Sequence, residues 1–221
     1  MLNTVVSTVA IIDSGIGGIS VLKKLISKYN FGNYIYFADN LNMPYGNKSE
    51  KFLTKRIKEI INLLQTNYKV DLIIIACNTA SCVVSKININ NVVCLNFDRK
   101  ETYLTTPLTA KLQNKPNFIK DRTLAQHIEE NINNKEGLRK IVKRHIDIKN
   151  LNKHKNLILG CTHYELVEDI FKELCPNTKI ICNSENILND ISINSKELNV
   201  VFITSKQSNS YVENLKELLR S

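Results

Sequence analysis

The chain has 221 residues, which is enough for one large domain or two small ones with buried cores. Its hydrophobic share of 43% is ordinary for a globular protein, and no apolar run approaches the roughly 18 residues that cross a membrane. The net charge of +9 comes from basic residues scattered along helix-like patterns. We therefore expect a solvated positive surface that helps to attract an acidic substrate, with no nucleic-acid and no membrane partner.

The first half of the chain alternates predicted strands with predicted helices. An apolar lead-in without the features of a signal peptide runs into the first strand, and Ser49 is placed to cap the longest amphipathic helix. This order predicts a parallel α/β sheet. Strands are expected at residues 8–12, 34–38, 71–76 and 91–95, and helices at 19–28 and from 49 to about 68.

The second half is less regular but continues the α/β pattern. A helix-rich stretch is expected at residues 121–148, with a break near 133–137, and an amphipathic helix at 208–219. Further strands are expected at residues 103–106, 157–160, 179–182 and 200–204.

The six cysteines contain no C-x-x-C pair, so their spacing favours neither a disulfide scaffold nor a zinc site. We expect reduced thiols, a cytoplasmic location and no bound metal. Two of the cysteines, Cys77 and Cys161, lie in similar segments in which an apolar run is followed by a small residue, the cysteine and polar residues that can open a helix. In a parallel sheet each thiol would stand at the carboxyl end of a strand, where a helix N-terminus favours the thiolate.

Each of these signals has a plainer interpretation when it is taken alone. Cys77, Cys161 and His163 could be ordinary buried residues. The glycine turn at residues 15–18 fails the dinucleotide fingerprint, because Ser20 replaces its last glycine, and it could be a tight strand–helix turn capped by Asp13. It could equally bring backbone N–H groups to a small anion, with Asp13 and Ser14 beside it.

Together, the motifs resemble those of the cofactor-independent aspartate/glutamate racemase superfamily, and most of all those of the glutamate racemases. They occur in the order of that family over most of the chain. The matching segments are residues 12–21, Asp39 with 44–49, 76–81 and 159–164, and more weakly 104–109 and 201–205.

The resemblance implies two pseudo-symmetric open α/β domains with mainly parallel sheets and the active site between them. The first domain would comprise residues 1–95 and 182–221, and the second, shortened domain residues 96–181. It also implies no cofactor, a small acidic amino-acid substrate and a possible homodimer. The implied catalytic residues are Cys77 and Cys161 as bases, with Asp13 and His163 beside them. The implied substrate-binding residues are Ser14, Pro44, Tyr45, Gly46, Asn78, Thr79, Thr109 and Thr162.

The chain departs from the family pattern in its middle, which is shorter. Asn42 stands where an arginine is common, and residues 111–113 replace the usual helix start after the threonine loop. The resemblance also implies an acidic residue near the second cysteine, for which the sequence offers no matching position.

Two thiols facing one pocket meet the chemical need of racemisation, in which one base removes the α-proton and an acid on the opposite face delivers another. We therefore expect a two-base glutamate racemase that supplies D-glutamate for peptidoglycan, with aspartate as the nearest rival substrate. Other hypotheses stay open: another isomerase or a decarboxylase of the superfamily, a non-catalytic amino-acid-binding paralogue, and a thiol redox or metal protein that uses Cys161 and His163.

Overall fold

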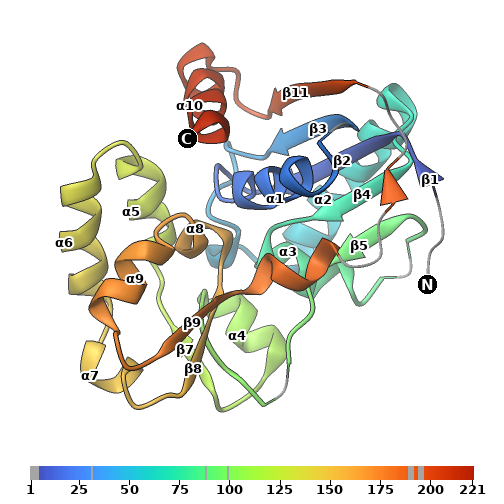
Figure 1. The fold of residues 1–221 in the computed structure, drawn as a ribbon. Coiled ribbons are helices and arrows are strands. Elements are labelled where there is room, and N and C mark those ends of the chain that lie inside the picture. Colours follow the sequence, from blue (N-terminus) through green and yellow to red (C-terminus); the bar gives the residue numbers. More distant parts are fainter. Residues whose placement is uncertain (1–4, 31, 88, 99, 189–191, 194–196) are drawn as a thin grey trace.

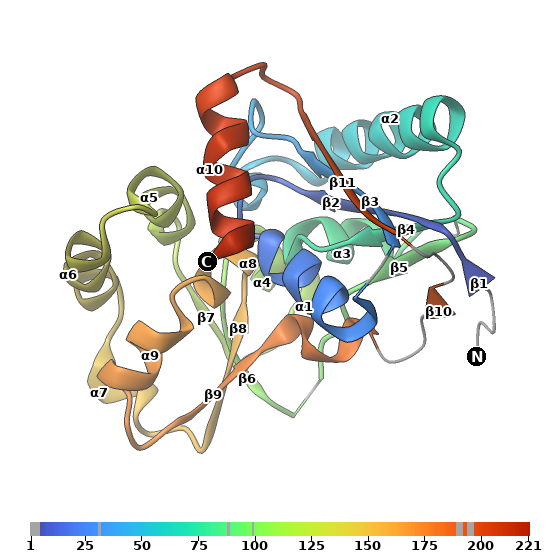
Figure 2. The same cartoon turned by 45° about the horizontal axis from the view of Figure 1, so that its top comes forward.

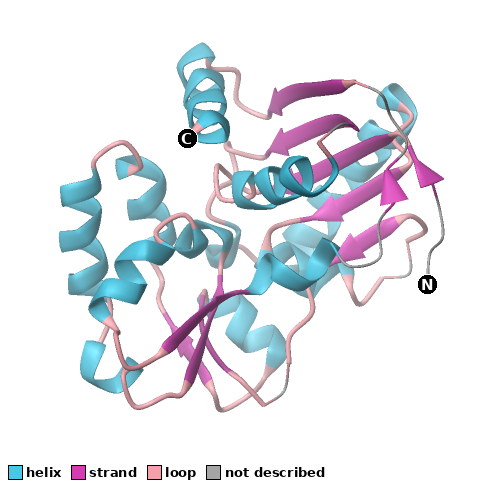
Figure 3. Cartoon of the chain, in the orientation of Figure 1, coloured by secondary structure: helices cyan, strands magenta, loops and turns pink. Residues whose placement is uncertain are grey.

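A computed structural model describes residues 5–30, 32–87, 89–98, 100–188, 192–193 and 197–221. In these ranges the chain forms two larger parallel sheets, each with helices on both faces, and a short two-stranded parallel sheet of Val5–Val6 and Ser192–Ile193 (Figure 1 and Figure 3). The strands are β1 (Val5–Val6), β2 (Thr8–Asp13), β3 (Gly32–Ala38), β4 (Leu72–Ile75), β5 (Val92–Cys94), β6 (Thr102–Thr105), β7 (Phe118–Lys120), β8 (Asn156–Gly160), β9 (Lys179–Cys182), β10 (Ser192–Ile193) and β11 (Leu198–Thr204).

The helices connect and cover these strands. They are α1 (Ile19–Tyr29), α2 (Glu50–Tyr68), α3 (Asn78–Val84), α4 (Pro107–Gln113), α5 (Leu124–Asn131), α6 (Lys135–His145), α7 (Ile148–Leu151), α8 (Thr162–Glu165), α9 (Glu168–Leu174) and α10 (Asn209–Arg220). Two 3₁₀ turns, Tyr45–Asn47 and Asn183–Leu188, lie in the connections. Among the described helices, none is both long and apolar enough to cross a membrane.

The two sheets repeat one strand order. The first runs β11-β3-β2-β4-β5 and the second β7-β6-β8-β9, and the strand pairs within both are parallel. When β2–β5 are matched to β6–β9 in chain order, the two four-strand sets have the same arrangement, and β11 is an addition to the first. The cysteine-bearing strands β4 and β8 are therefore equivalent, which confirms the expected α/β fold with two similar halves.

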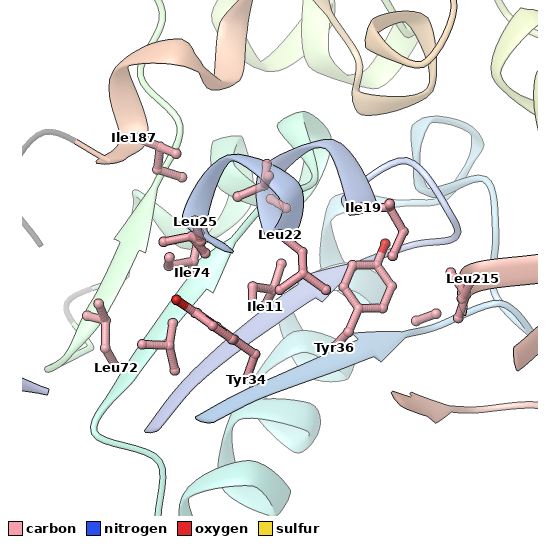
Figure 4. Close-up of a cluster of buried hydrophobic side chains, with 14 of the residues drawn as sticks. Ile11, Ile19, Leu22, Leu25, Tyr34, Tyr36, Leu72, Ile74, Ile187 and Leu215 are labelled. Carbon is pink, nitrogen blue, oxygen red and sulfur yellow. The ribbon is translucent and has the colours of Figure 1, made fainter. Parts of the chain in front are cut away.

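The first sheet is buried on both faces. Alternate residues of its strands point to opposite sides, so that Ile11 and Ile74 pack under α1 and α10, while Ile12 and Ile73 pack against α2 and α3. Figure 4 shows the α1 side, where Leu22 lies over the two central strands. In Figure 2, α10 lies beside α1, so the described C-terminal part of the chain returns to the first sheet.

The second sheet is covered in the same way by shorter helices. Leu157 and Leu159 of β8 face the core formed with α5, α6 and α9, and Ile158 between them faces the α4 side together with Ala110. Each half thus holds its central cysteine strand between two apolar layers. Because the strand is packed on both faces, the position of its carboxyl end is fixed. The position of the cysteine that follows this end is therefore fixed as well.

Most predicted elements are confirmed, including the break between α5 and α6 and the cap of α2, where Ser49 Oγ accepts from the Phe52 N–H at 3.2 Å. The prediction missed α4, β7, β1 and β10. Residues 111–113, where the sequence departs from the family's usual helix start, lie in the last part of α4, which begins at Pro107. Residues 1–4 of the expected lead-in lie outside the described residues. Cys182 ends β9 of the second sheet, although the expected boundary put it with the first; the domain division itself stays a proposal.

The two halves approach each other tightly at Gly17. A Cβ atom on Gly17 would lie 2.5 Å from Thr162 Oγ1 and 2.8 Å from the His163 backbone nitrogen. The turn before α1 can therefore touch the start of α8 only because residue 17 has no side chain.

We expect Gly17→Ala to lower the melting temperature by about 2–12 °C, because overpacking against backbone costs about 1–3 kcal/mol and a chain of this size loses about 2–4 °C per kcal/mol. Thermal unfolding followed by circular dichroism measures it. Gly137→Ala is the matched control: the three atoms nearest to its Cβ all belong to the Asn134 side chain, which caps α6 by accepting from the Gly137 N–H, so at most this cap is lost while alanine favours the helix. Equal effects of the two substitutions would contradict the tight contact at Gly17.

Candidate active site

The two cysteine turns line one cavity between the sheets. Cys77 follows β4 and precedes α3, and Cys161 follows β8 and precedes α8, so both lie at the carboxyl ends of equivalent strands. The cavity has an empty volume of about 270 Å³. Its lining residues are Ser14, Pro44, Tyr45, Gly46, Cys77, Asn78, Thr79, Thr106, Ala125, Cys161, Thr162 and His163. Apart from Asp13 and Thr109, every residue predicted for the site is among them.

Asp13, at the end of β2, lies directly behind this lining. It is fully buried and accepts hydrogen bonds from the Gly15 N–H at 2.9 Å and from Thr162 Oγ1 at 3.0 Å. Burial raises the pKa of its carboxyl from 3.8 to about 6, although the positive charge of His163 and the two hydrogen bonds work against this rise. A group with such a pKa can give or take a proton near neutral pH.

Cys77 is a buried thiol next to this carboxyl. Its Sγ lies 3.9 Å from Ser14 Oγ. Burial raises the pKa of the thiol far above its ordinary value, and the charges of Asp13 and Cys161 add to the rise, while the Ala80 N–H at the start of α3 opposes it. Without substrate, Cys77 is therefore protonated at neutral pH.

Cys161 has a different neighbour, an imidazole that is held charged. His163 Nδ1 lies 4.0 Å from Cys161 Sγ, and His163 Nε2 lies 2.5 Å from Glu129 Oε2. Burial alone would lower the pKa of His163, but its hydrogen bonds with Cys161 and Glu129 outweigh burial and raise the pKa well above 6.5. Cys161 thus lies beside a positively charged imidazole, whereas Cys77 lies beside a carboxyl group.

Glu129 of α5 is a site residue that the sequence did not reveal. It accepts from the Ile16 N–H at 3.0 Å and from the Tyr211 hydroxyl at 2.5 Å, in addition to its contact with His163. Burial would raise the pKa of this carboxyl, but the hydrogen bond and charge of His163 outweigh burial and lower it. Glu129 is thus an acidic residue close to the second cysteine, although the sequence alone offered no match for the one that the resemblance implied.

Three threonine hydroxyls close the cavity on another side. Thr79 of α3 lies 3.0 Å from Thr106 and 2.9 Å from Thr109, and the latter two are 3.0 Å apart, measured between Oγ1 atoms. All three are buried, and they come from both halves. Thr109 therefore contacts the lining without being part of it, and Thr106 joins the site although it was not predicted.

The turn at residues 44–46 is held from behind by a buried ion pair. The Tyr45 hydroxyl donates to Asp39 Oδ2 at 2.7 Å, and Arg56 of α2 binds both carboxylate oxygens of Asp39 at 2.8 and 3.0 Å. Asn42, which replaces an arginine of the family pattern, donates to the same carboxylate. Arg56 donates to both carboxylate oxygens of Asp39. Asp39 therefore has an ion-pair partner although residue 42 is an asparagine.

Metal-ligand atoms lie close together elsewhere in the described chain. Glu168, Cys182 and Glu185 have ligand atoms within 4.8 Å of one another, but Lys172 already pairs with Glu168 at 2.8 Å. These residues lie outside the cavity lining, so this cluster is separate from the cysteine site.

Comparisons with known proteins show the family to which the chain belongs. No protein-family model matches the chain. A glutamate racemase of Buchnera aphidicola subsp. Acyrthosiphon pisum (strain APS) is 30% identical, over 95% of this chain and 93% of its own length. The chain belongs to the glutamate racemase family.

Solved glutamate racemases share its fold. An isoform from Bacillus anthracis superposes with a TM-score of 0.79 at 22% identity, over 97% of this chain and 94% of its own. The enzyme from Francisella tularensis, solved in complex with D-glutamate, superposes with a TM-score of 0.74 at 22% identity, over 97% and 94% of the two chains.

Asp13 gives this glutamate racemase family member a testable pH signature. Its pKa is about 6 in the folded protein and 3.8 in a free peptide, so the folded state binds more protons between these values and loses stability as the pH rises through them. The Asp13→Asn variant cannot lose a proton at this position. We therefore expect its unfolding free energy, measured relative to that of the wild type, to be about 3 kcal/mol higher at pH 7 than at pH 3.5, since each unit of pKa difference corresponds to about 1.4 kcal/mol.

Urea unfolding at both pH values measures this change, and Asp71→Asn is the control. Burial would raise the pKa of Asp71, but hydrogen bonds from Thr8 and Ser7 outweigh burial and lower it, so the control should lose relative stability as the pH rises. A pH-independent difference for Asp13→Asn would show that Asp13 has no raised pKa.

Proposed function

We propose that this protein interconverts L- and D-glutamate, with Cys77 and Cys161 as the two bases. The observation that carries the proposal is that two equivalent strands place two buried thiols in the lining of one cavity. A racemase needs one proton-transfer group on each face of the α-carbon, and a repeated half-site supplies such a pair. Family membership supports glutamate as the substrate.

The different neighbours of the thiols suggest their roles. In one direction of the reaction Cys161, which lies beside His163, would act as the base that removes the α-proton, while Cys77 would act as the acid that donates its proton to the opposite face. One C–H bond breaks and another forms, and the negative charge moves from Cys161 to Cys77. For the opposite enantiomer the roles exchange, with Asp13 and His163 positioned to return protons.

Donors around the cavity would stabilise the charge that develops on the substrate. Ser14, Asn78 and Thr79 are buried residues of the cavity lining that carry hydroxyl and amide groups. The empty space between the lining side chains is about 270 Å³ in all, and the room left inside it is close to that of a single water molecule. Since an amino acid is larger, we infer that the two halves separate to admit it.

Three broader assignments belong to the same proposal. The product D-glutamate would serve peptidoglycan synthesis, and the six free thiols fit a reducing cytoplasm. A homodimer would have an exposed apolar edge available, since Leu198 and Val201 of β11 are about half exposed, at 47% and 49%. Sedimentation velocity would reject the dimer if only monomer were found at micromolar concentration.

Deuterium exchange tests the activity directly. In D₂O we expect the α-proton of L- and of D-glutamate to be replaced by deuterium as optical activity is lost, followed by NMR and circular dichroism. Aspartate is the comparison substrate and should react much more slowly. Binding of glutamate without exchange in the folded, reduced protein would point instead to a non-catalytic binding protein.

The cysteines have a separate test. We expect Cys77→Ala and Cys161→Ala each to lower the rate of racemisation by at least about 10³-fold. Without either thiol, no group can transfer a proton on one face of the α-carbon. Cys175→Ala is the control, since Cys175 is buried in the second core outside the cavity lining, and it should keep its activity. Two-way racemisation that survives either active-site substitution would rule out the two-base mechanism.

A further inference from the structure

The Asn78 side chain is buried in the cavity wall, and the NH₂ group of its amide has no hydrogen-bond partner in the described part of the chain. The residue is 2% exposed. A buried amide donor without a partner costs free energy, typically about 1–3 kcal/mol. Because Asn78 lines the cavity, an acceptor that enters the cavity could satisfy this donor.

The other half of the amide is held by Asn183. Asn183 Nδ2 donates to Asn78 Oδ1 at 2.6 Å, and Asn183 is itself 8% exposed. If the Asn78 amide were turned over, two NH₂ groups would face each other. The contact therefore directs the NH₂ group of Asn78 away from Asn183.

Asn183 is well fixed for this task. It follows β9 of the second sheet, whereas Asn78 belongs to the first-sheet half, so the contact bridges the two halves. The next residue, Ser184, donates its N–H to Glu165 at 3.0 Å and its hydroxyl to the same carboxylate at 2.5 Å. Lys24 of α1 also donates to Ser184 Oγ, at 2.7 Å. This buried node fixes the backbone that carries Asn183.

We propose that Asn183 is a positioning residue that holds the Asn78 amide with its NH₂ group toward the cavity, as a donor to a carboxylate of the amino-acid substrate. The inference rests on the proposed function, since it assigns one contact within that site. An amide in the opposite orientation would present its oxygen to the same carboxylate and repel it.

The substitution Asn183→Asp tests the orientation, because it keeps the size of the side chain and leaves only acceptors. The Asn78 amide would then turn over to donate to the new carboxylate. We expect KM to rise about 10-fold or more for both glutamate enantiomers, the range for a hydrogen bond to a charged group. The change in kcat should be much smaller, and the melting temperature should stay within a few degrees of the wild type.

A double-mutant cycle separates this effect from the added charge. In an Asn78→Ala background, Asn183→Asp should change KM less than two-fold, because the group through which Asn183 acts is gone. A similar rise in KM in both backgrounds would assign the effect to charge and overturn the inference. An unchanged KM in the single variant would also overturn it, since it would mean that Asn78 already donates to Asn183.

Failure of the inference can be told apart from failure of the proposed function. If the wild type racemises glutamate and Asn183→Asp behaves like it, only the role of Asn183 is lost. If the wild type binds glutamate without racemising it, the proposed function is lost, and calorimetric dissociation constants of the same variants replace KM. A wild type that does neither overturns both.

Discussion

Three buried carboxylates connect the two halves of this protein, and the cavity depends on them. Asp13 of the first half accepts from Thr162 of the second. Glu129 of the second half accepts from the Ile16 N–H and Tyr211 of the first, and Glu165 accepts from Ser20 of α1. Buried charges are tolerated only when they are paired, so each half supplies partners that the other cannot do without. The halves therefore meet at a defined place, between the two thiols.

The repeated strand order makes the halves alike, but their charges differ. On one side a thiol lies next to Asp13, which carries or lacks a negative charge near neutral pH; on the other, a thiol lies next to an imidazolium held by Glu129. Two-base chemistry needs one protonated and one deprotonated group at the start of each turnover. A symmetric backbone with asymmetric neighbours meets that need without moving either thiol.

The sequence predicted those features that local patterns encode. The strands before Cys77 and Cys161 are continuous apolar runs, and the turns after them carry distinctive polar residues, so both thiols and their neighbours could be located. No local sequence pattern of this kind singles out Glu129, Arg56 or Asn183. Each reaches the site from an element distant in sequence, and nothing in the surrounding pattern separates Glu129 from the solvent-facing acids of an amphipathic helix. Short elements such as β7, with three residues, fall below the length at which periodicity is informative.

The late return of the chain to the first sheet has a consequence for synthesis on the ribosome. β11 adds the outer strand beside β3, and Tyr211 at the start of α10 donates to the carboxylate that holds His163 charged. Domains fold progressively as they emerge, at about 5–20 residues per second. Both cysteines leave the exit tunnel well before β11 and α10. The nascent chain thus carries both thiols before Tyr211 is present, and the hydrogen bonds of Glu129, which holds the imidazole beside Cys161, are completed only by the last described elements.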